Sequence, residues 1–179
     1  MTPVEVWTVG HSTRSAAELI ALLRAHAIER LVDVRTIPRS RRHPHFDRDA
    51  LPDLLAPAGI AYTHMRGLGG LRHPRPDSVN MAWRNAGFRG YADYMQTPEF
   101  AQHLEALIAL AGRERIAVMC AEAVPWHCHR SLLADALVAR GVVVRHILTE
   151  KGAEPHALTD FAHVEGTRVS YPARQGRLA

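Results

Sequence analysis

Three features are scarce or missing in this chain of 179 residues, and each excludes a class of protein. Two cysteines, Cys120 and Cys128, are too few for a scaffold held together by disulfides. No apolar run reaches the roughly 18 residues of a membrane-spanning helix, so we expect no membrane partner. Residues 1–7 lack the basic and apolar regions of a secretory signal, and we therefore expect a cytoplasmic protein.

Lysine is almost absent as well. Lys151 is the only lysine among 22 basic residues, and the formal net charge is +4. Genomic base composition is one explanation for this bias. The other is functional, because a guanidinium group binds carboxylate and phosphate in a two-pronged geometry that an ammonium group does not offer.

What is present is the pattern of an α/β protein. Ser15 and Glu18 form a capping box that begins one helix, and Thr97-Pro98-Glu99 begins another that ends near Gly112. Strands are predicted over residues 4–10, 31–35, 60–64, 116–120 and 142–147, and further helices over 49–56, 88–95, 129–140 and 158–164. This alternation predicts a single domain, residues 1–165, with a mainly parallel five-stranded sheet flanked by helices, and a C-terminal tail, residues 166–179.

A long irregular insertion, residues 65–96, interrupts the alternation. It contains Gly67-Leu-Gly-Gly70 and Arg72-His-Pro-Arg-Pro76, which do not fit regular structure. Segments of this kind inside a compact domain are often lids or binding loops, and we expect a lid here. Trp83 and Phe88 either stack on a ligand or pin the segment to the body of the domain.

Polar residues follow each of the five predicted strands. In an open parallel sheet the strand ends share one edge, where ligands bind in the crevice, so these residues are expected to converge on one site. Strand-end loops are also polar simply because they meet water. The set comprises His11 and Ser12 after the first strand, Arg35, Arg39 and Arg41 after the second, His64 and Arg66 after the third, Cys120 and Glu122 after the fourth, and His146 after the fifth.

The segment from Cys120 to Arg130 is the densest in reactive side chains. Cys128, His129 and Arg130 fall at a predicted helix N-terminus, which favours negative charge and lowers the pKa of a thiol. Three interpretations stay open: a nucleophilic thiolate, an anion-binding turn in which the thiol is structural, or a metal site. The metal ligands would be Cys120, His127, Cys128 and His129, although their spacing matches no standard zinc pattern.

Simple thiol-phosphatase chemistry is disfavoured by the spacing. The phosphate loop of such enzymes needs an arginine six positions after the cysteine, and Trp126 occupies that place after Cys120.

The loop over residues 35–48 carries five arginines, which suggests nucleic-acid binding as a different function. Such a patch could bind a nucleic-acid backbone in a salt-dependent manner, or it could be no more than a solvated face. The patch is short, lysine is scarce and no nucleic-acid-binding motif accompanies it, which favours a pocket over an extended track.

The chain also resembles the bacterial family catalogued as domain of unknown function 488. The resemblance is carried by residues 8–14 (TVGHSTR), 31–35 (LVDVR) with Pro38, Ser40 and Arg41, 68–70 (LGG), 88–95 (FRGYADYM), 119–122 (MCAE), 128–130 (CHR) and 146–147 (HI). It implies an α/β fold with a shared site, and its name assigns no activity. The family-type candidates for that site are His11, Arg35, Arg41, Glu122, Cys128, His129 and Arg130.

The leading hypothesis is an enzyme of hydrolase or transferase type that acts on a phosphate-bearing or other anionic substrate, such as a nucleotide. His11, His64, Glu122 and Cys128 are the candidate catalytic residues. The candidate anion-binding residues are Ser12, Arg35, Arg39, Arg41, Arg66, His129 and Arg130. A nucleic-acid-associated module and a thiol or metal site are the alternatives, and no cofactor is identified.

Overall fold

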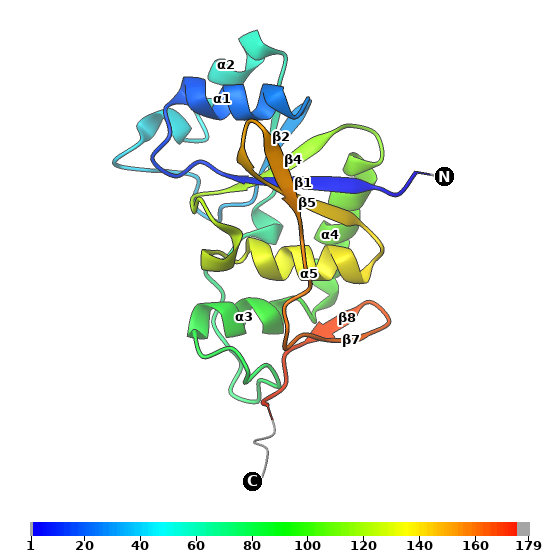
Figure 1. The fold of residues 1–179 in the computed structure, drawn as a ribbon. Coiled ribbons are helices and arrows are strands. Elements are labelled where there is room, and N and C mark those ends of the chain that lie inside the picture. The colour runs from blue at the N-terminus through cyan, green and yellow to red at the C-terminus, as the bar shows by residue number, and fades with distance from the viewer. Residues whose placement is uncertain (1, 175–179) are drawn as a thin grey trace.

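The computed structural model describes residues 2–174, and a six-stranded sheet forms its centre (Figure 1). The strand order is β3-β2-β4-β1-β5-β6, and neighbouring strands are parallel except for β6, which is antiparallel to β5. Strands β1 and β4 are buried along nearly their whole length, which suits the centre of a sheet that is covered on both faces. The strands are β1 (Glu5–Gly10), β2 (Arg30–Asp33), β3 (Ala61–His64), β4 (Ile116–Cys120), β5 (Val143–Thr149) and β6 (Gly152–Pro155).

Helices cover the two faces of this sheet. The predicted caps are confirmed: Ser15 and Glu18 exchange both hydrogen bonds of a capping box, and the Thr97 side chain accepts a hydrogen bond from the backbone N–H of Phe100. Gly141, at φ +79°, follows the last of the five helices in the conformation that the sequence predicts. One face carries α1 (Ala16–Ala25) and α2 (Leu51–Leu55), and the other carries α3 (Ala86–Tyr94), α4 (Pro98–Ala111) and α5 (Arg130–Ala139) (Figure 1).

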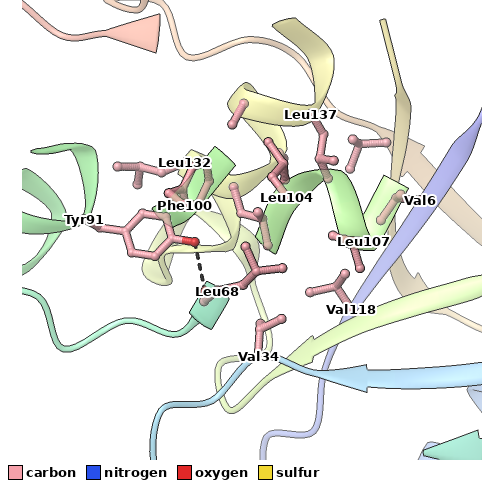
Figure 2. Packing of buried hydrophobic residues seen from close by; sticks show 14 of the residues in the cluster. Val6, Val34, Leu68, Tyr91, Phe100, Leu104, Leu107, Val118, Leu132 and Leu137 are labelled. Carbon is pink, nitrogen blue, oxygen red and sulfur yellow. Dashed lines mark hydrogen bonds between the residues drawn. The ribbon is translucent and has the colours of Figure 1, made fainter. Parts of the chain in front are cut away.

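Each face of the sheet has its own apolar core. The larger core packs α3, α4 and α5 against the sheet, and Figure 2 shows Leu104 and Leu107 of α4 inside it. The hydroxyl of Tyr91 donates to the backbone oxygen of Leu68 at 2.9 Å, so the buried phenol keeps a hydrogen-bond partner (Figure 2). The smaller core lies beneath α1 and α2 and includes Leu23 and Phe46.

The fold class is confirmed as α/β, with corrections to its edges. The sheet has six strands rather than five, because β6 pairs with β5 after a tight turn. Gly152-Ala-Glu-Pro155 has no β-branched residue, so its composition gives no strand signal. The irregular insertion is confirmed over residues 69–85, and the helix predicted within it over residues 88–95 is confirmed as α3.

The predicted helix over 158–164 is wrong. These residues lead instead into a hairpin of β7 (His163–Glu165) and β8 (Arg168–Ser170), with Gly166 at φ +62° in the turn. Val169 and Tyr171 pack into the larger core, so burial of these two side chains outweighs local propensity. The last part of the predicted tail, residues 175–179, lies outside the described residues.

Within residues 2–174, no helix combines the length and the apolar character that crossing a membrane requires.

Candidate functional site

A cleft of about 430 Å³ opens where β1 and β4 end side by side. Gly10 and Cys120 are paired across these strands, and the chain then leaves in opposite directions, to α1 on one face and towards α5 on the other. Diverging connections of this kind create the crevice in which open α/β sheets bind ligands. The cleft lies between the loops after β1, β2 and β4, and part of the irregular insertion closes its remaining side.

The two cysteines lie together in the wall of this cleft. Cys120 ends β4, Cys128 lies two residues before the start of α5, and both thiols are free. Their Sγ atoms are 2.7 Å apart, and Nδ1 of His129 is 3.5 Å from Sγ of Cys128. This arrangement lowers the pKa of Cys128 to about 4, because Cys120 donates a hydrogen bond to the thiolate and His129 and the backbone N–H of Arg130 add theirs.

Cys120 has the opposite tendency. Burial raises the pKa of its thiol, and the hydrogen bond with Cys128 acts in the same direction. The favoured state of the pair at neutral pH is therefore a Cys128 thiolate that accepts a hydrogen bond from a Cys120 thiol.

The loop that joins the cysteines packs tightly on the end of β1. A Cβ atom on Gly10 would lie 1.6 Å from the backbone oxygen of Glu122, so only glycine fits there. The backbone N–H groups of His11 and Ser12 donate to the oxygens of Cys120 and Ala121 at 3.0 and 2.9 Å. These contacts fix the position of the two cysteines relative to the end of β1.

The buried side chain of Arg130 binds the same loop through hydrogen bonds. Its side chain is 1% exposed, and its guanidinium group donates to Thr8 Oγ1 at 3.0 Å and to the backbone oxygens of Glu122 and Ala123 at 2.8 and 3.2 Å. It is not among the residues that line the cleft. Its position therefore differs from the anion-contacting one that the sequence suggests.

Arg35 and His11 form the opposite wall. Arg35 donates to both carboxylate oxygens of the buried Asp33, at 2.9 and 2.7 Å, and its Nη1 lies 3.4 Å from His11 Nε2. Burial lowers the pKa of His11 to about 4, and its Nδ1–H donates to the backbone oxygen of Ser12 at 2.9 Å. His11 is therefore neutral at pH 7, with Nε2 as a hydrogen-bond acceptor.

The other predicted site residues divide into two groups. Arg39, Glu122, His127 and His129 line the cleft together with Cys128, and Arg39 and Glu122 are exposed. The remaining four, Ser12, Arg41, His64 and Arg66, are not among its lining residues.

His64 and Arg66 belong to a neighbouring hollow of about 550 Å³ that shares Arg39 with the cleft. Nε2 of His64 donates to the backbone oxygen of Arg35 at 2.7 Å, which ties β3 to the loop after β2. Asp47 and Asp49 line the same hollow, so its charge is mixed.

The irregular insertion closes one side of the cleft with Gly70, Leu71 and Phe88. A Cβ atom on Gly70 would approach Nδ1 of His129 to 3.1 Å, so a bare backbone lets the segment lie against the histidine. Trp83 packs edge-on against Phe88 and Tyr171, at centroid distances of 5.2 and 5.5 Å, and anchors the segment.

Buried polar side chains fasten the insertion to the body. The carboxylate of Asp93 on α3 accepts hydrogen bonds from the backbone N–H of Arg75, the hydroxyl of Ser78 and the amide of Asn80, at 2.8, 2.6 and 2.7 Å. Asn80 in turn accepts the backbone N–H of Tyr171 at 2.9 Å. The insertion thus covers one side of the cleft and is tied by hydrogen bonds to α3 and to the residue after the β7–β8 hairpin.

A buried chain of hydrogen bonds next to the cleft was not found by sequence reasoning. It runs from Asp135 through His156 and His146 to Thr8, with contacts of 2.7, 2.8 and 2.6 Å, and Arg130 continues it to the cysteine loop. His146 was expected at the end of a strand among the site residues, but it lies inside β5, paired with Thr8 of β1, and does not line the cleft. A polar Asp135 amid the apolar positions of α5 was the signal that could have revealed its buried partner.

The proposed metal ligands do not form a cluster. Across residues 2–174, no group of three or more histidine, cysteine, aspartate or glutamate side chains is placed to hold a metal ion.

Comparison with known proteins supports the resemblance noted in the sequence. No curated protein and no solved structure matches the chain. The sequence profile of one family, described as "Domain of unknown function DUF488", matches residues 15–137, well over half of the chain. The matched region contains Arg35, both cysteines and His129, whereas His11 lies just outside it. The chain therefore belongs to the DUF488 family.

Proposed function

We propose that this protein is an enzyme that uses the Cys128 thiolate as a nucleophile on a phosphate-bearing or similarly anionic substrate. One observation carries the proposal: the thiolate of Cys128 faces the same cleft as the guanidinium groups of Arg35 and Arg39. A thiolate beside a cationic wall is suited to attack an electrophilic centre next to a bound anion.

Arg39 is the residue best suited to hold the anion. The charge of Arg35 is largely balanced by the bidentate ion pair with Asp33. Arg39 is exposed on the cleft wall and makes no ion pair within residues 2–174. Its guanidinium group is therefore free to pair with a carboxylate or phosphate.

Two groups in the cleft can exchange protons with the substrate. His11 presents the unprotonated Nε2 of a neutral imidazole, and Glu122 offers an exposed carboxylate on the rim. Because both groups are unprotonated, either can act as a general base: after sulfur attack it would deprotonate the water or hydroxyl acceptor that releases the product, while the leaving group takes its proton from solvent.

The cleft also has an apolar side that suits a flat organic group. Ile37 is 60% exposed and Leu71 is 73% exposed, and both line the cleft with Phe88. Such surfaces suit a nucleobase or another planar ring, so a nucleotide-sized substrate fits both the charge and the apolar wall.

Protection of Cys128 from alkylation tests this assignment. We expect AMP, used as the probe anion, to slow the reaction of Cys128 with iodoacetamide, because the bound anion covers the thiolate. Arg39→Ala should weaken this protection about tenfold, equivalent to about 1.4 kcal/mol. Arg41→Ala is the matched control, because Arg41 is exposed in the same loop outside the cleft. Absence of protection by AMP and by inorganic phosphate would contradict the proposal.

The second candidate function is nucleic-acid binding by the arginine loop. It is favoured by the exposure of Arg39, Arg41, Arg42 and Arg48 in one loop. Binding of a single-stranded oligonucleotide should then fall steeply as salt is raised, and Arg41→Ala should weaken it as much as Arg39→Ala. Equal affinities of the wild type and both variants, or a flat salt response, would dismiss this function.

A further inference from the structure

We propose that Cys120 and Cys128 form a reversible dithiol–disulfide centre that hydroperoxides oxidise from the cleft. This centre uses the same Cys128 as the proposed nucleophilic function. It needs neither the anionic substrate nor Arg39, so the two proposals can fail separately.

The first support is the distance between the two sulfur atoms. Sγ of Cys120 and Sγ of Cys128 are 2.7 Å apart while both thiols are free. A disulfide bond is about 2.05 Å long, so the sulfur atoms need to approach by less than about 1 Å. Small rotations of the two cysteine side chains can supply a shift of this size, so the loop that Arg130 and the end of β1 hold need not move.

The second support is the difference in access between the two thiols. Both cysteines line the cleft, but Cys128 is 7% exposed and Cys120 is 2% exposed. Cys128 is also the residue that the hydrogen bonds of Cys120, His129 and Arg130 hold as a thiolate. An oxidant that enters the cleft therefore meets a reactive sulfur first, with a protonated thiol directly behind it.

These positions assign the two steps of the reaction. In the first, the Cys128 thiolate attacks one oxygen of the hydroperoxide, the O–O bond breaks, and Cys128 becomes a sulfenic acid while hydroxide or alkoxide leaves. In the second, the Cys120 sulfur attacks the sulfenic sulfur, the S–O bond breaks, and the thiol proton leaves with that oxygen as water. Two electrons pass from the pair of sulfurs to the peroxide, and an external dithiol returns them.

The chain contains no other cysteine, so only one intramolecular disulfide can form. Its formation would remove the Cys128 thiolate from the cleft. It would also keep Cys128 from further, irreversible oxidation to the sulfinic acid. The centre would thus make any thiol chemistry in the cleft sensitive to peroxide.

Intact-mass spectrometry of the whole protein tests the proposal without a substrate. With one equivalent of hydrogen peroxide, we expect a product about 2 Da lighter, which dithiothreitol returns to the starting mass. Near pH 5 the reaction should be roughly tenfold faster than that of free cysteine, since little free cysteine is thiolate there.

Two variants separate the roles of the sulfurs. Cys120→Ser should stop at a sulfenic acid about 16 Da heavier, which dimedone traps. Cys128→Ser should consume peroxide no faster than free cysteine. Wild-type protein that gives only sulfinic acid, only intermolecular disulfides or no reaction would overturn the proposal, and this result does not depend on whether either variant folds.

Discussion

Nε2 of His146 lies 2.8 Å from Nδ1 of His156, and this contact joins the central sheet to a buried carboxylate on α5. The groups at the two ends of this series of hydrogen bonds, Arg130 and Asp135, determine which atom donates in each bond. Arg130 donates to Thr8 Oγ1, so the Thr8 hydroxyl donates to His146 Nδ1. His146 Nε2–H then donates to His156, whose Nε2–H donates to Asp135. Each contact between Thr8 and Asp135 then has one donor and one acceptor, in keeping with the lowered pKa of the buried His146.

The two buried histidines with lowered pKa values should make the protein sensitive to acid. Burial lowers the pKa of His11 to about 4 and that of His146 to about 3, whereas both titrate near 6.5 in the unfolded chain. Between about pH 6.5 and pH 4 the unfolded state therefore binds more protons. The free energy of unfolding should fall with decreasing pH by up to about 1.4 kcal/mol per pH unit for each histidine.

Urea unfolding at a series of pH values measures this slope. His11→Gln should reduce the slope of the unfolding free energy against pH by the contribution of one histidine. His163→Gln is the control, because the His163 side chain is 58% exposed. An unchanged slope in His11→Gln would show that this histidine does not stay neutral in the folded protein.

Asp135→Asn should be strongly destabilising. The carboxylate accepts hydrogen bonds from His156 Nε2, the Thr159 backbone N–H and the Tyr171 hydroxyl at 2.7, 3.0 and 2.7 Å. An amide would replace one of the two accepting oxygens with an NH2 donor that faces another donor, so we expect a loss of about 2–4 kcal/mol in the free energy of unfolding. Asp53→Asn, on the exposed side of α2, should change it by less than about 0.5 kcal/mol in the same denaturation assay.

Gly10→Ala should displace the cysteine loop. The added methyl group would overlap the backbone oxygen of Glu122, which cannot move without disturbing the bonds from Arg130. We expect a loss of about 3 kcal/mol or more, measured by chemical denaturation, and a changed alkylation rate at Cys128. Gly112→Ala is the matched control, since its nearest contact would be an ordinary 3.4 Å. Equal stability of the two variants would refute the close approach.

The reactivity of Cys128 should depend on pH in a way that reports its partner. Because its pKa is lowered to about 4, the rate of iodoacetamide alkylation should be flat above about pH 6 and fall as the pH is lowered through 4. Cys120→Ala removes the main hydrogen-bond donor and should move the whole profile to higher pH. Cys120→Ser, which keeps a hydroxyl donor, should move it less. Coincident profiles for all three proteins would mean that Cys120 does not stabilise the thiolate.

The central strands and the capped helices were predictable because their signals are local. The apolar runs of β1 and β4 and the caps at Ser15 and Thr97 decide their structure within a few residues. The hairpin was not predictable, since β7 is exposed and β8 depends on Val169 and Tyr171 finding the larger core. That decision depends on tertiary packing, which a local pattern does not contain.

The candidate site was predictable in location but not in the roles of its arginines. The topology places His11, Arg35 and Cys128 on one sheet edge, as the strand order implies. Arg39 and Arg130 look alike in sequence, yet one is exposed in the cleft and the other is buried beneath a loop. Their difference comes from distant partners: Arg130 contacts Thr8, 122 positions away.

The hairpin of β7 and β8 determines how the irregular insertion over the cleft can open locally. Its first strand is exposed along its whole length, so opening the hairpin exposes little apolar surface beyond Val169 and Tyr171. Such an opening would release Asn80 from the Tyr171 backbone while the six-stranded sheet stays intact. Amide hydrogens near Asn80 should then exchange with solvent together with those of the hairpin, and long before those of β1 and β4.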